Sequence, residues 1–295
     1  MADRVAVIAH RKKTLNEAGL DALRATLALE GVSDPLWYEV NKSRKAPKKA
    51  GKALEDGAEL VLVWGGDGMV QRCVDALAGS GVPLGLLPAG TANLLASNLG
   101  IPHDLGPAVR TALYGARRKI DLGRLEGEHF AVMAGAGFDA TLVGGADRQT
   151  KARLGRLAYF RSGLRGLLGP TVEARVTVDG TDWYRGPASC VLLGNVGRIV
   201  GGVPAFDDAK PDDGVLEVGV ATASGVLQWA RTLARMTLGR SEQSPFVRIT
   251  RGRKIKVRLG APLPVELDGG ARGEVTKFTA EVAPGALTVC VPTGT

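Results

Sequence analysis

The 295-residue chain has few cysteines, few histidines and few aromatic side chains, and no long apolar segment. Cys73, Cys190 and Cys290 lie far apart and are odd in number, which excludes a disulfide framework and a closely spaced cysteine metal site. The three histidines show no spacing typical of zinc ligands. No run approaches the roughly 20 apolar residues of a membrane-spanning helix, and the N-terminus shows no secretory signal. We therefore expect a protein of a reduced, cytoplasmic compartment.

Basic residues exceed acidic ones, with 38 Lys and Arg against 30 Asp and Glu, so the net charge is +8. Such an excess favours anionic partners. The densest basic clusters lie at 42–52 and 248–258, and a solvated face is the simpler interpretation of each. No aromatic residues alternate with these basic residues, and no zinc-finger or RNA-binding motif is present. The sequence therefore gives no reason to expect a nucleic-acid partner.

Strand and helix patterns alternate over about the first 122 residues, which predicts a parallel sheet covered by helices. The expected strands are 5–9, 34–40, 59–64 and 82–87, and the expected helices are 16–30, 48–56, 69–78 and 92–99.

After residue 121 the pattern changes to short apolar or alternating runs, separated by turns such as Asp179-Gly180 and Asp268-Gly269. This pattern is typical of a mostly antiparallel β domain with one or two inserted helices. The expected strands are 130–133, 174–178, 190–193, 216–220, 255–259 and 287–291.

Two glycine-containing turns carry the first chemical signal. Gly65-Gly66-Asp67-Gly68 lies between a predicted strand and a predicted helix, and Pro88–Asn93 lies at the same junction one unit later. Glycines let the backbone approach a ligand closely, and the N–H groups at a helix start favour phosphate. Both turns follow the carboxyl ends of parallel strands, where ligands bind in such sheets. The plainer alternative is that both are only tight connections.

Other nucleotide-binding motifs are missing or incomplete. The chain has neither a Walker-type P-loop nor the motifs of a protein kinase. Gly135-Ala136-Gly137 begins a dinucleotide-type fingerprint, but no βαβ continuation follows it, so we do not expect an NAD site there.

Further segments extend the pattern of these turns over nearly the whole chain: Gly65–Gly68, Leu87–Asn93, Leu99–Pro102, Ile120–Gly123, Ala134–Asp139, Gly194-Asn195, Gly201-Gly202 and Pro211–Leu216. In these segments the sequence resembles the diacylglycerol kinase catalytic-domain family, which includes bacterial lipid kinases and sphingosine kinases and is distantly related to NAD kinases. The resemblance implies an ATP- and Mg²⁺-dependent kinase that phosphorylates a lipid hydroxyl group.

The resemblance also implies the architecture. The fold class is α/β plus all-β, with a Rossmann-like α/β nucleotide domain over residues 1–122 and a β-sandwich, lipid-binding domain over residues 123–295. The last strand is expected either in the second domain or back in the first. ATP would bind in the cleft between the two domains.

The site residues implied by the resemblance are few. Asp67 would activate the acceptor hydroxyl or hold catalytic magnesium, and the sequence does not separate these roles. Residues that would contact ATP are Gly65, Gly66, Gly68, Thr91, Asn93, Lys12 and Lys13. Asp121 would be an acidic residue facing the cleft. A second-domain metal site would use the Asp213 side chain with the carbonyls of Lys210 and Val215, although Asp212-Asp213-Gly214 by itself is typical of a β-turn.

The sequence departs from the family pattern at four places. His10–Lys13 replaces an Asn-Pro turn, Met69 replaces a threonine, and Leu94 replaces an aspartate. Gly270 stands where the family has a glutamate in Asp-Gly-Glu. Three outcomes stay open: Asp67 suffices, a carboxylate such as Glu274 substitutes, or the protein is a weak catalyst.

Membrane contact is the remaining expectation. Residues 151–168 would form a basic amphipathic helix that lies at the membrane interface, or a helix that only packs on the second domain. The same two interpretations apply to residues 226–238. The overall expectation is a bacterial, cytoplasmic lipid kinase, peripheral to the inner face of the membrane, with a homodimer left open. The alternatives are a kinase of a soluble acceptor and a non-catalytic nucleotide- or lipid-binding protein.

Overall fold

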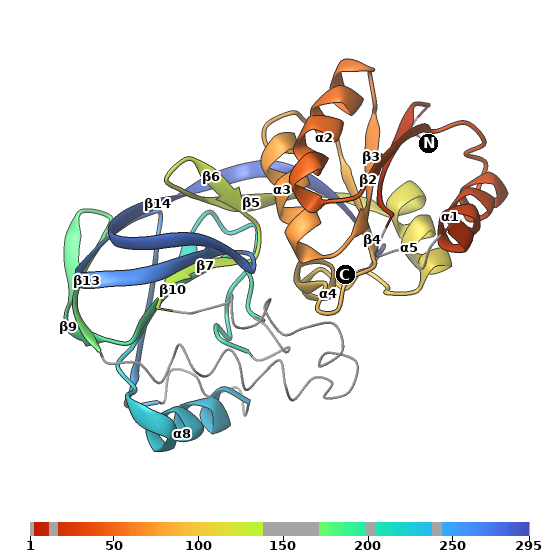
Figure 1. Ribbon diagram of the computed structural model, residues 1–295. Helices are drawn as coiled ribbons and strands as arrows, with labels where there is room; N and C mark the ends of the chain where they lie inside the picture. The colour runs from red at the N-terminus through yellow and green to blue at the C-terminus, as the bar shows by residue number, and fades with distance from the viewer. Residues whose placement is uncertain (1–2, 12–16, 138–170, 199–203, 238–243, 295) are drawn as a thin grey trace. The chain divides into compact units, whose positions relative to one another are not determined.

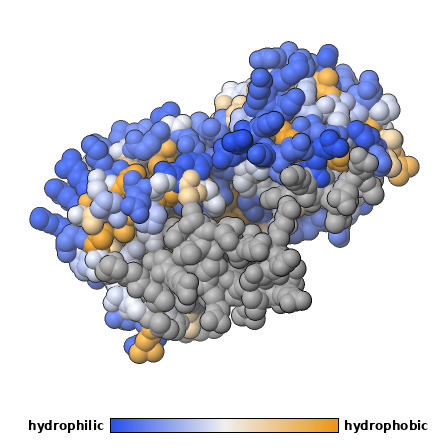
Figure 2. All heavy atoms as spheres, in the orientation of Figure 1, coloured by the Kyte–Doolittle hydropathy of each residue, from blue (hydrophilic) through white to orange (hydrophobic). Residues whose placement is uncertain are grey.

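The computed structural model describes residues 3–11, 17–137, 171–198, 204–237 and 244–294 (Figure 1). The chain forms two compact units. One comprises Met1–Leu122 with Pro284–Thr295, and the other comprises Gly123–Ala283. On the face seen in Figure 2, hydrophobic atoms are scattered among hydrophilic ones over the second unit. None of the described helices is long and apolar enough to span a membrane.

The first unit is built on a parallel sheet in the order β4-β3-β1-β2. Its strands are β1 (Val5–His10), β2 (Leu36–Val40), β3 (Leu60–Gly65) and β4 (Leu84–Pro88). Every residue of β1 and β3 is buried, as expected of central strands covered on both faces. The helices are α1 (Glu17–Leu29), the 3₁₀ turn η1 (Ser43–Lys45), α2 (Ala46–Glu55), α3 (Asp67–Leu77), α4 (Leu94–Asn98) and α5 (Leu105–Tyr114).

All eight elements predicted for this region are present, with ends shifted by a few residues, but α5 was not predicted. Gly106 and Pro107 make its first turn look like a loop, yet proline is tolerated there because those N–H groups have no partner within a helix. The helix packs closely on β4. A Cβ at Gly85 would lie 2.5 Å from Leu62 Cδ2 and 2.7 Å from Ala112 Cβ, so only glycine allows this approach.

The second unit is a sandwich of antiparallel strands. Two strands are shared with the first unit: β5 (Ala116–Leu125) begins there, and β14 (Gly270–Val291) ends there. The other elements are β6 (Glu128–Phe130), β7 (Met133–Ala136), β8 (Val172–Val178), β9 (Thr181–Ala188), β10 (Cys190–Gly194), β11 (Leu216–Ala221), α8 (Gly225–Thr237), β12 (Val247–Gly252) and β13 (Lys254–Leu267). The end of β14 returns to the first unit, where Val289 pairs in parallel with Leu84 of β4.

The long strand β13 belongs to both layers of the sandwich. Its first half pairs with β8, and its last residues pair with β7 after a register shift. The layers are therefore β9-β8-β13-β14 and β12-β11-β10-β7-β13-β14. Alternate residues of both layers, such as Val176, Val218, Val257 and Phe278, meet in one apolar core.

The expected strand over 130–133 is wrong. The chain forms β6 up to Phe130 and β7 from Met133, with Ala131 and Val132 between them. The physical reason is tertiary, because the N–H groups of Ala131 and Val132 donate to the Asp268 carboxylate instead of to a neighbouring strand. Strands β5, β9 and β12 were not predicted, since charged residues, glycine or proline interrupt their apolar patterns.

Candidate functional site

The two glycine turns lie side by side at the carboxyl edge of the parallel sheet. Gly65 ends β3 and pairs with Pro88 at the end of β4, and the Ala89 N–H donates to the Gly65 carbonyl at 3.0 Å. The turns also touch directly. A Cβ at Gly90 would lie 2.6 Å from the Gly66 Cα, so glycine is required for this approach.

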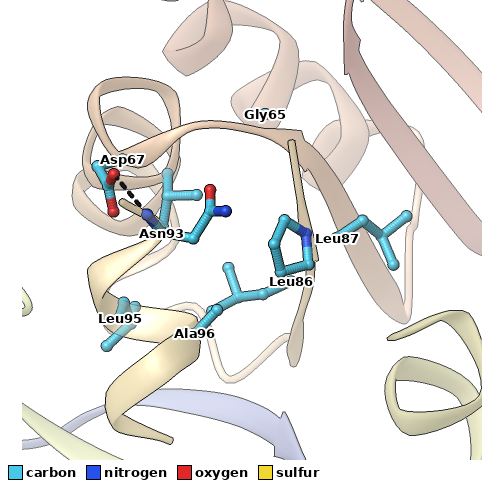
Figure 3. A pocket seen from close by; sticks show the side chains of 9 residues that line it. Gly65, Asp67, Leu86, Leu87, Asn93, Leu95 and Ala96 are labelled. Atoms are coloured by element: carbon cyan, nitrogen blue, oxygen red, sulfur yellow. Dashed lines mark hydrogen bonds between the residues drawn. The ribbon is translucent and has the colours of Figure 1, made fainter. Parts of the chain in front are cut away.

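Asp67 joins the two turns. It is the first residue of α3, and one carboxylate oxygen accepts the Asn93 N–H at 2.9 Å. Figure 3 shows this bond between Asp67 and Asn93. The other oxygen accepts the Leu94 N–H at 2.5 Å. The side chain of Asp67 therefore caps the start of α4, although it belongs to a different helix. Each oxygen keeps a further lone pair, so the carboxylate can still accept a proton or bind a cation.

Asn93 holds the second turn in shape. Its φ of +47° lies in the left-handed region, which asparagine tolerates better than most residues. The buried amide accepts the Gly90 N–H at 2.8 Å and donates to the Gly90 carbonyl at 3.0 Å. Asn93 was predicted as an ATP contact, and in this structure its side chain serves the turn itself.

A pocket of about 220 Å³, including space open to solvent, opens beside these two residues (Figure 3). The space that its walls enclose is far smaller than the roughly 300–1,000 Å³ of pockets that enclose a drug-sized ligand, so the pocket does not enclose a nucleotide in this structure. Its lining is mostly apolar, with Asp67 and Asn93 as its polar members: Gly65, Asp67, Val70, Leu86, Leu87, Pro88, Asn93, Leu95 and Ala96.

The start of α3 offers free backbone donors. Gly66 makes no side-chain cap there, and no described residue accepts the N–H groups of Asp67 and Gly68. Gly68 is exposed with open space around its Cα, and Thr91 of the other turn is also exposed. Exposed N–H groups at the positive end of a helix fit a phosphate group.

The remaining predicted ATP contacts differ in character. Gly65 is buried, and a Cβ there would lie 2.8 Å from the Met69 sulfur. Methionine at position 69, where the resemblance predicts threonine, therefore affects packing, because the Met69 side chain is fully buried beneath the turn. Lys12 and Lys13 lie outside the described residues, as does the predicted basic helix over 151–168.

Asp121 is buried in the first unit, and its carboxylate accepts the Gly285 N–H at 2.7 Å. This bond fastens β5 to the returning part of β14. The residue predicted to face a ligand therefore has a structural bond that the sequence did not indicate.

The predicted metal site before β11 is a turn. The Val215 N–H donates to the Asp213 carboxylate at 3.2 Å, and Lys210 and Asp213 are exposed. One carboxylate oxygen remains for a cation, but the described residues contain no group of three His, Cys, Asp or Glu side chains suited to a metal. The site would therefore depend on backbone carbonyls.

Asp268 is a residue whose role sequence reasoning missed. It lies in the two-residue turn between β13 and β14, with φ values of +44° at Asp268 and +84° at Gly269, as in a type I′ hairpin. Its buried carboxylate accepts three backbone N–H groups, from Ala131, Val132 and Met133, at 2.8–2.9 Å. The Asp-Gly pair indicated the turn, but not the distant donors.

Gly270 follows this turn, in the position of the family glutamate. A Cβ there would lie 2.7 Å from Arg272 Nη1, which donates to the Gly270 carbonyl at 3.1 Å. The Arg272 guanidinium is also paired with Glu128 at 2.8 Å. A cationic side chain thus lies beside Gly270, the position at which the resemblance predicts a glutamate. The candidate substitute Glu274 is exposed on β14, opposite Pro264.

Two family models match the chain. One, described as the diacylglycerol kinase catalytic domain, covers residues 4–125, and the other, described as the YegS C-terminal NAD kinase beta sandwich-like domain, covers residues 132–291. Their boundaries agree with an α/β domain followed by a β-sandwich, which confirms the predicted fold class.

Curated relatives cover most of the chain. A probable lipid kinase YegS-like from Pseudomonas aeruginosa is 32% identical over 99% of this chain and 95% of that protein. A diacylglycerol kinase from Bacillus subtilis is 28% identical over 72% of this chain and 71% of that protein. An uncharacterized protein from Synechocystis is 28% identical over 80% of this chain, which spans 56% of that longer protein.

Solved structures share the fold. A putative diacylglycerol kinase from Bacillus anthracis aligns with a TM-score of 0.81 at 21% identity, over 99% of this chain and 96% of that one. An NAD kinase from Archaeoglobus fulgidus, solved in complex with ATP, aligns with a TM-score of 0.55 at 11% identity, over 98% and 94%. At these identities the likeness concerns the fold alone.

Proposed function

The chain belongs to the YegS-like lipid kinases of the diacylglycerol kinase family, and on that premise we propose that it transfers the γ-phosphate of ATP to the hydroxyl group of a lipid alcohol such as diacylglycerol. One observation carries the proposal. The Asp67 carboxylate is fixed between two glycine turns, beside N–H groups at the start of α3 for which the described residues supply no acceptor. Phosphoryl transfer needs hydrogen-bond donors that bind the phosphates and an acidic group that positions the acceptor hydroxyl or a metal ion.

The glycine turns fit the phosphates of ATP. The Asp67 and Gly68 N–H groups would bind phosphate oxygens, and exposed Thr91 would add a hydroxyl from the second turn. Mg²⁺ is usually held by one or two carboxylates together with substrate phosphates, and the Asp67 carboxylate fits that ligand set. When bound, Mg²⁺ would neutralise charge on the phosphates.

In the reaction, the acceptor oxygen would bond to the γ-phosphorus while the bond from that phosphorus to the β–γ bridging oxygen breaks and ADP leaves. The hydroxyl proton would pass to Asp67, whose oxygens each keep a lone pair beyond the backbone hydrogen bonds. This assignment makes Asp67 the acceptor of the proton without help from a residue at position 270.

The test is transfer of labelled γ-phosphate from Mg-ATP into solvent-extractable product, using mixed micelles of diacylglycerol, a sphingoid base and other lipid alcohols. We expect Asp67→Asn to lose at least about 100-fold in rate, the usual loss when a proton-transfer group is removed. The matched control is Asp75→Asn, an exposed acid on the same helix, which should keep the wild-type rate. Label in no lipid, with ATP still bound, would contradict the proposal, and soluble acceptors would then be tested.

A non-catalytic, nucleotide-binding role is the second candidate, because Gly270 stands where the resemblance predicts a glutamate and Arg272 lies beside it. Gly270→Glu tests it. The added Cβ would lie 2.7 Å from Arg272 Nη1, at the end of a flexible side chain, and 3.3 Å from the Leu267 carbonyl oxygen. Movement of Arg272 and a small backbone adjustment at Leu267 would allow the variant to fold. Ala271→Glu is the matched control, since it adds the same charge at an exposed neighbouring position. A wild-type protein that binds ATP without turnover, and gains turnover only in Gly270→Glu, would establish this second role.

A further inference from the structure

A row of four basic residues crosses the outer face of one sandwich layer. Arg185 of β9 pairs with Arg175 of β8, Arg175 pairs with Arg258 of β13, and Arg258 pairs with Lys277 of β14. Strands in a sheet lie about 4.8 Å apart, so this cation row spans about 14 Å. Four adjacent strands thus each place one basic residue in the same register.

The row points away from the protein core. Val176 and Val257, next to Arg175 and Arg258 in sequence, are buried in the sandwich interior, and alternate residues of a strand face opposite sides. All four residues of the row are exposed. Lys256, two residues before Arg258 on the same face, is exposed as well and widens the positive area.

The protein neutralises little of this charge. In the described part of the chain only Arg175 of the row has an ion pair, with Asp182. Glu173 lies on the same face near Arg175. Glu281 forms ion pairs with Lys254 and Arg124, which are outside the row. Like charges directly opposite on neighbouring strands destabilise a sheet. The cation row therefore costs folding stability, and an external anion would remove that cost.

We propose that the cation row docks the protein on the anionic surface of a lipid bilayer. The inference rests on the proposed function, because a lipid kinase must reach substrate held in a bilayer. An open sheet face with several cations suits a broad anionic surface, and each basic residue near such a surface strengthens binding. Single-stranded nucleic acid would need stacking aromatics, but Trp183 and Tyr184 of β9 pack against the core.

The experiment measures binding of the full chain to sedimented vesicles of phosphatidylcholine, with or without 30 mol% phosphatidylglycerol, at two salt concentrations. We expect salt-sensitive binding that requires phosphatidylglycerol, weakened about 5-fold by each neutralised residue of the row. The variant is Arg258→Gln/Lys277→Gln. Its matched control is Arg44→Gln/Lys45→Gln, which removes the same charge from the exposed basic cluster near α2.

A purely structural role of the cation row predicts a different result. If the row only served folding, the double variant would melt at a lower temperature, whereas relief of like-charge repulsion should leave the melting temperature unchanged or raise it. The same proteins are also titrated with a DNA duplex. The proposal would be overturned if both double variants lost vesicle binding equally, or if the row variant kept its vesicle binding. It would also be overturned if the row variant lost binding to the duplex but not to the vesicles. Phosphorylation of lipid in detergent micelles tests the proposed function separately, because it needs no docking.

Discussion

Asp67 accepts the backbone N–H of Asn93 at 2.9 Å, so a carboxylate from the helix after β3 holds the turn after β4. The bond, with its partner to Leu94, gives Asp67 a structural role beside the proposed chemical one. Loss of activity in an Asp67 variant must therefore be compared with its folding.

We expect Asp67→Ala to lower the free energy of unfolding of the first unit by about 1–2 kcal/mol, because the start of α4 loses its cap. Asp67→Asn keeps one acceptor oxygen and should lose less. Urea titration followed by circular dichroism measures both. Wild-type stability in Asp67→Ala would show that these two hydrogen bonds contribute nothing to folding.

Gly90→Ala should separate the two glycine turns, because its Cβ would meet the Gly66 Cα at 2.6 Å. We expect a loss of about 1–3 kcal/mol in unfolding free energy, typical of overpacking, and weaker ATP binding. Gly68→Ala is the matched control. Its Cβ meets nothing within 4 Å, and alanine favours a helix, so its stability should match or exceed that of the wild type. Thermal melting compares the two, and equal melting temperatures would contradict the prediction.

Asp268→Ala should destabilise the second unit by about 3 kcal/mol or more, because three buried N–H groups lose their acceptor at once. Alanine would also be strained at the positive φ of this position. Asp268→Asn tolerates that φ and keeps one acceptor oxygen, so its loss should be smaller. Guanidinium titrations of both variants check the order, and the reverse order would refute the explanation.

The Tyr38 hydroxyl donates to the Asp56 carboxylate at 2.5 Å. Burial, and then this bond, raise the pKa of Tyr38 from 10.0 to about 12. A pKa raised by folding contributes stability that is present below pH 10 and is lost as pH rises towards 12. The difference in unfolding free energy between wild type and Tyr38→Phe should therefore shrink over that interval. A difference that is constant from pH 8 to 12 would contradict the assignment.

Sequence patterns located most elements because the parallel strands are buried on both faces and the helices between them show one apolar face. They failed where a distant group decides the local structure. Ala131 and Val132 are apolar and typical of a strand, yet Asp268, more than 130 residues later, takes their N–H groups. No periodicity within residues 130–133 contains that information.

The candidate site divides in the same way. Gly65–Gly68 and Pro88–Asn93 were recognisable because glycine and asparagine between strand and helix indicate tight turns near a ligand. The hydrogen-bond partner of each side chain could not be predicted from the sequence. Asn93 bonds to its own turn, and Arg272 lies over Gly270, because these contacts depend on where the backbone places them in space.

The sequence by itself determined the alternation of strand and helix, the change to β structure near residue 122 and the family of this protein, since these follow from local hydrophobic period and from residue identity at fixed spacing. The tertiary structure alone decided that Asp67 caps α4 and that the cation row assembles from β9, β8, β13 and β14. Arg185 and Lys277 are 92 positions apart in the chain, and only the strand register makes them members of one row. Pairing partners are set by packing of the whole core, which no single segment encodes.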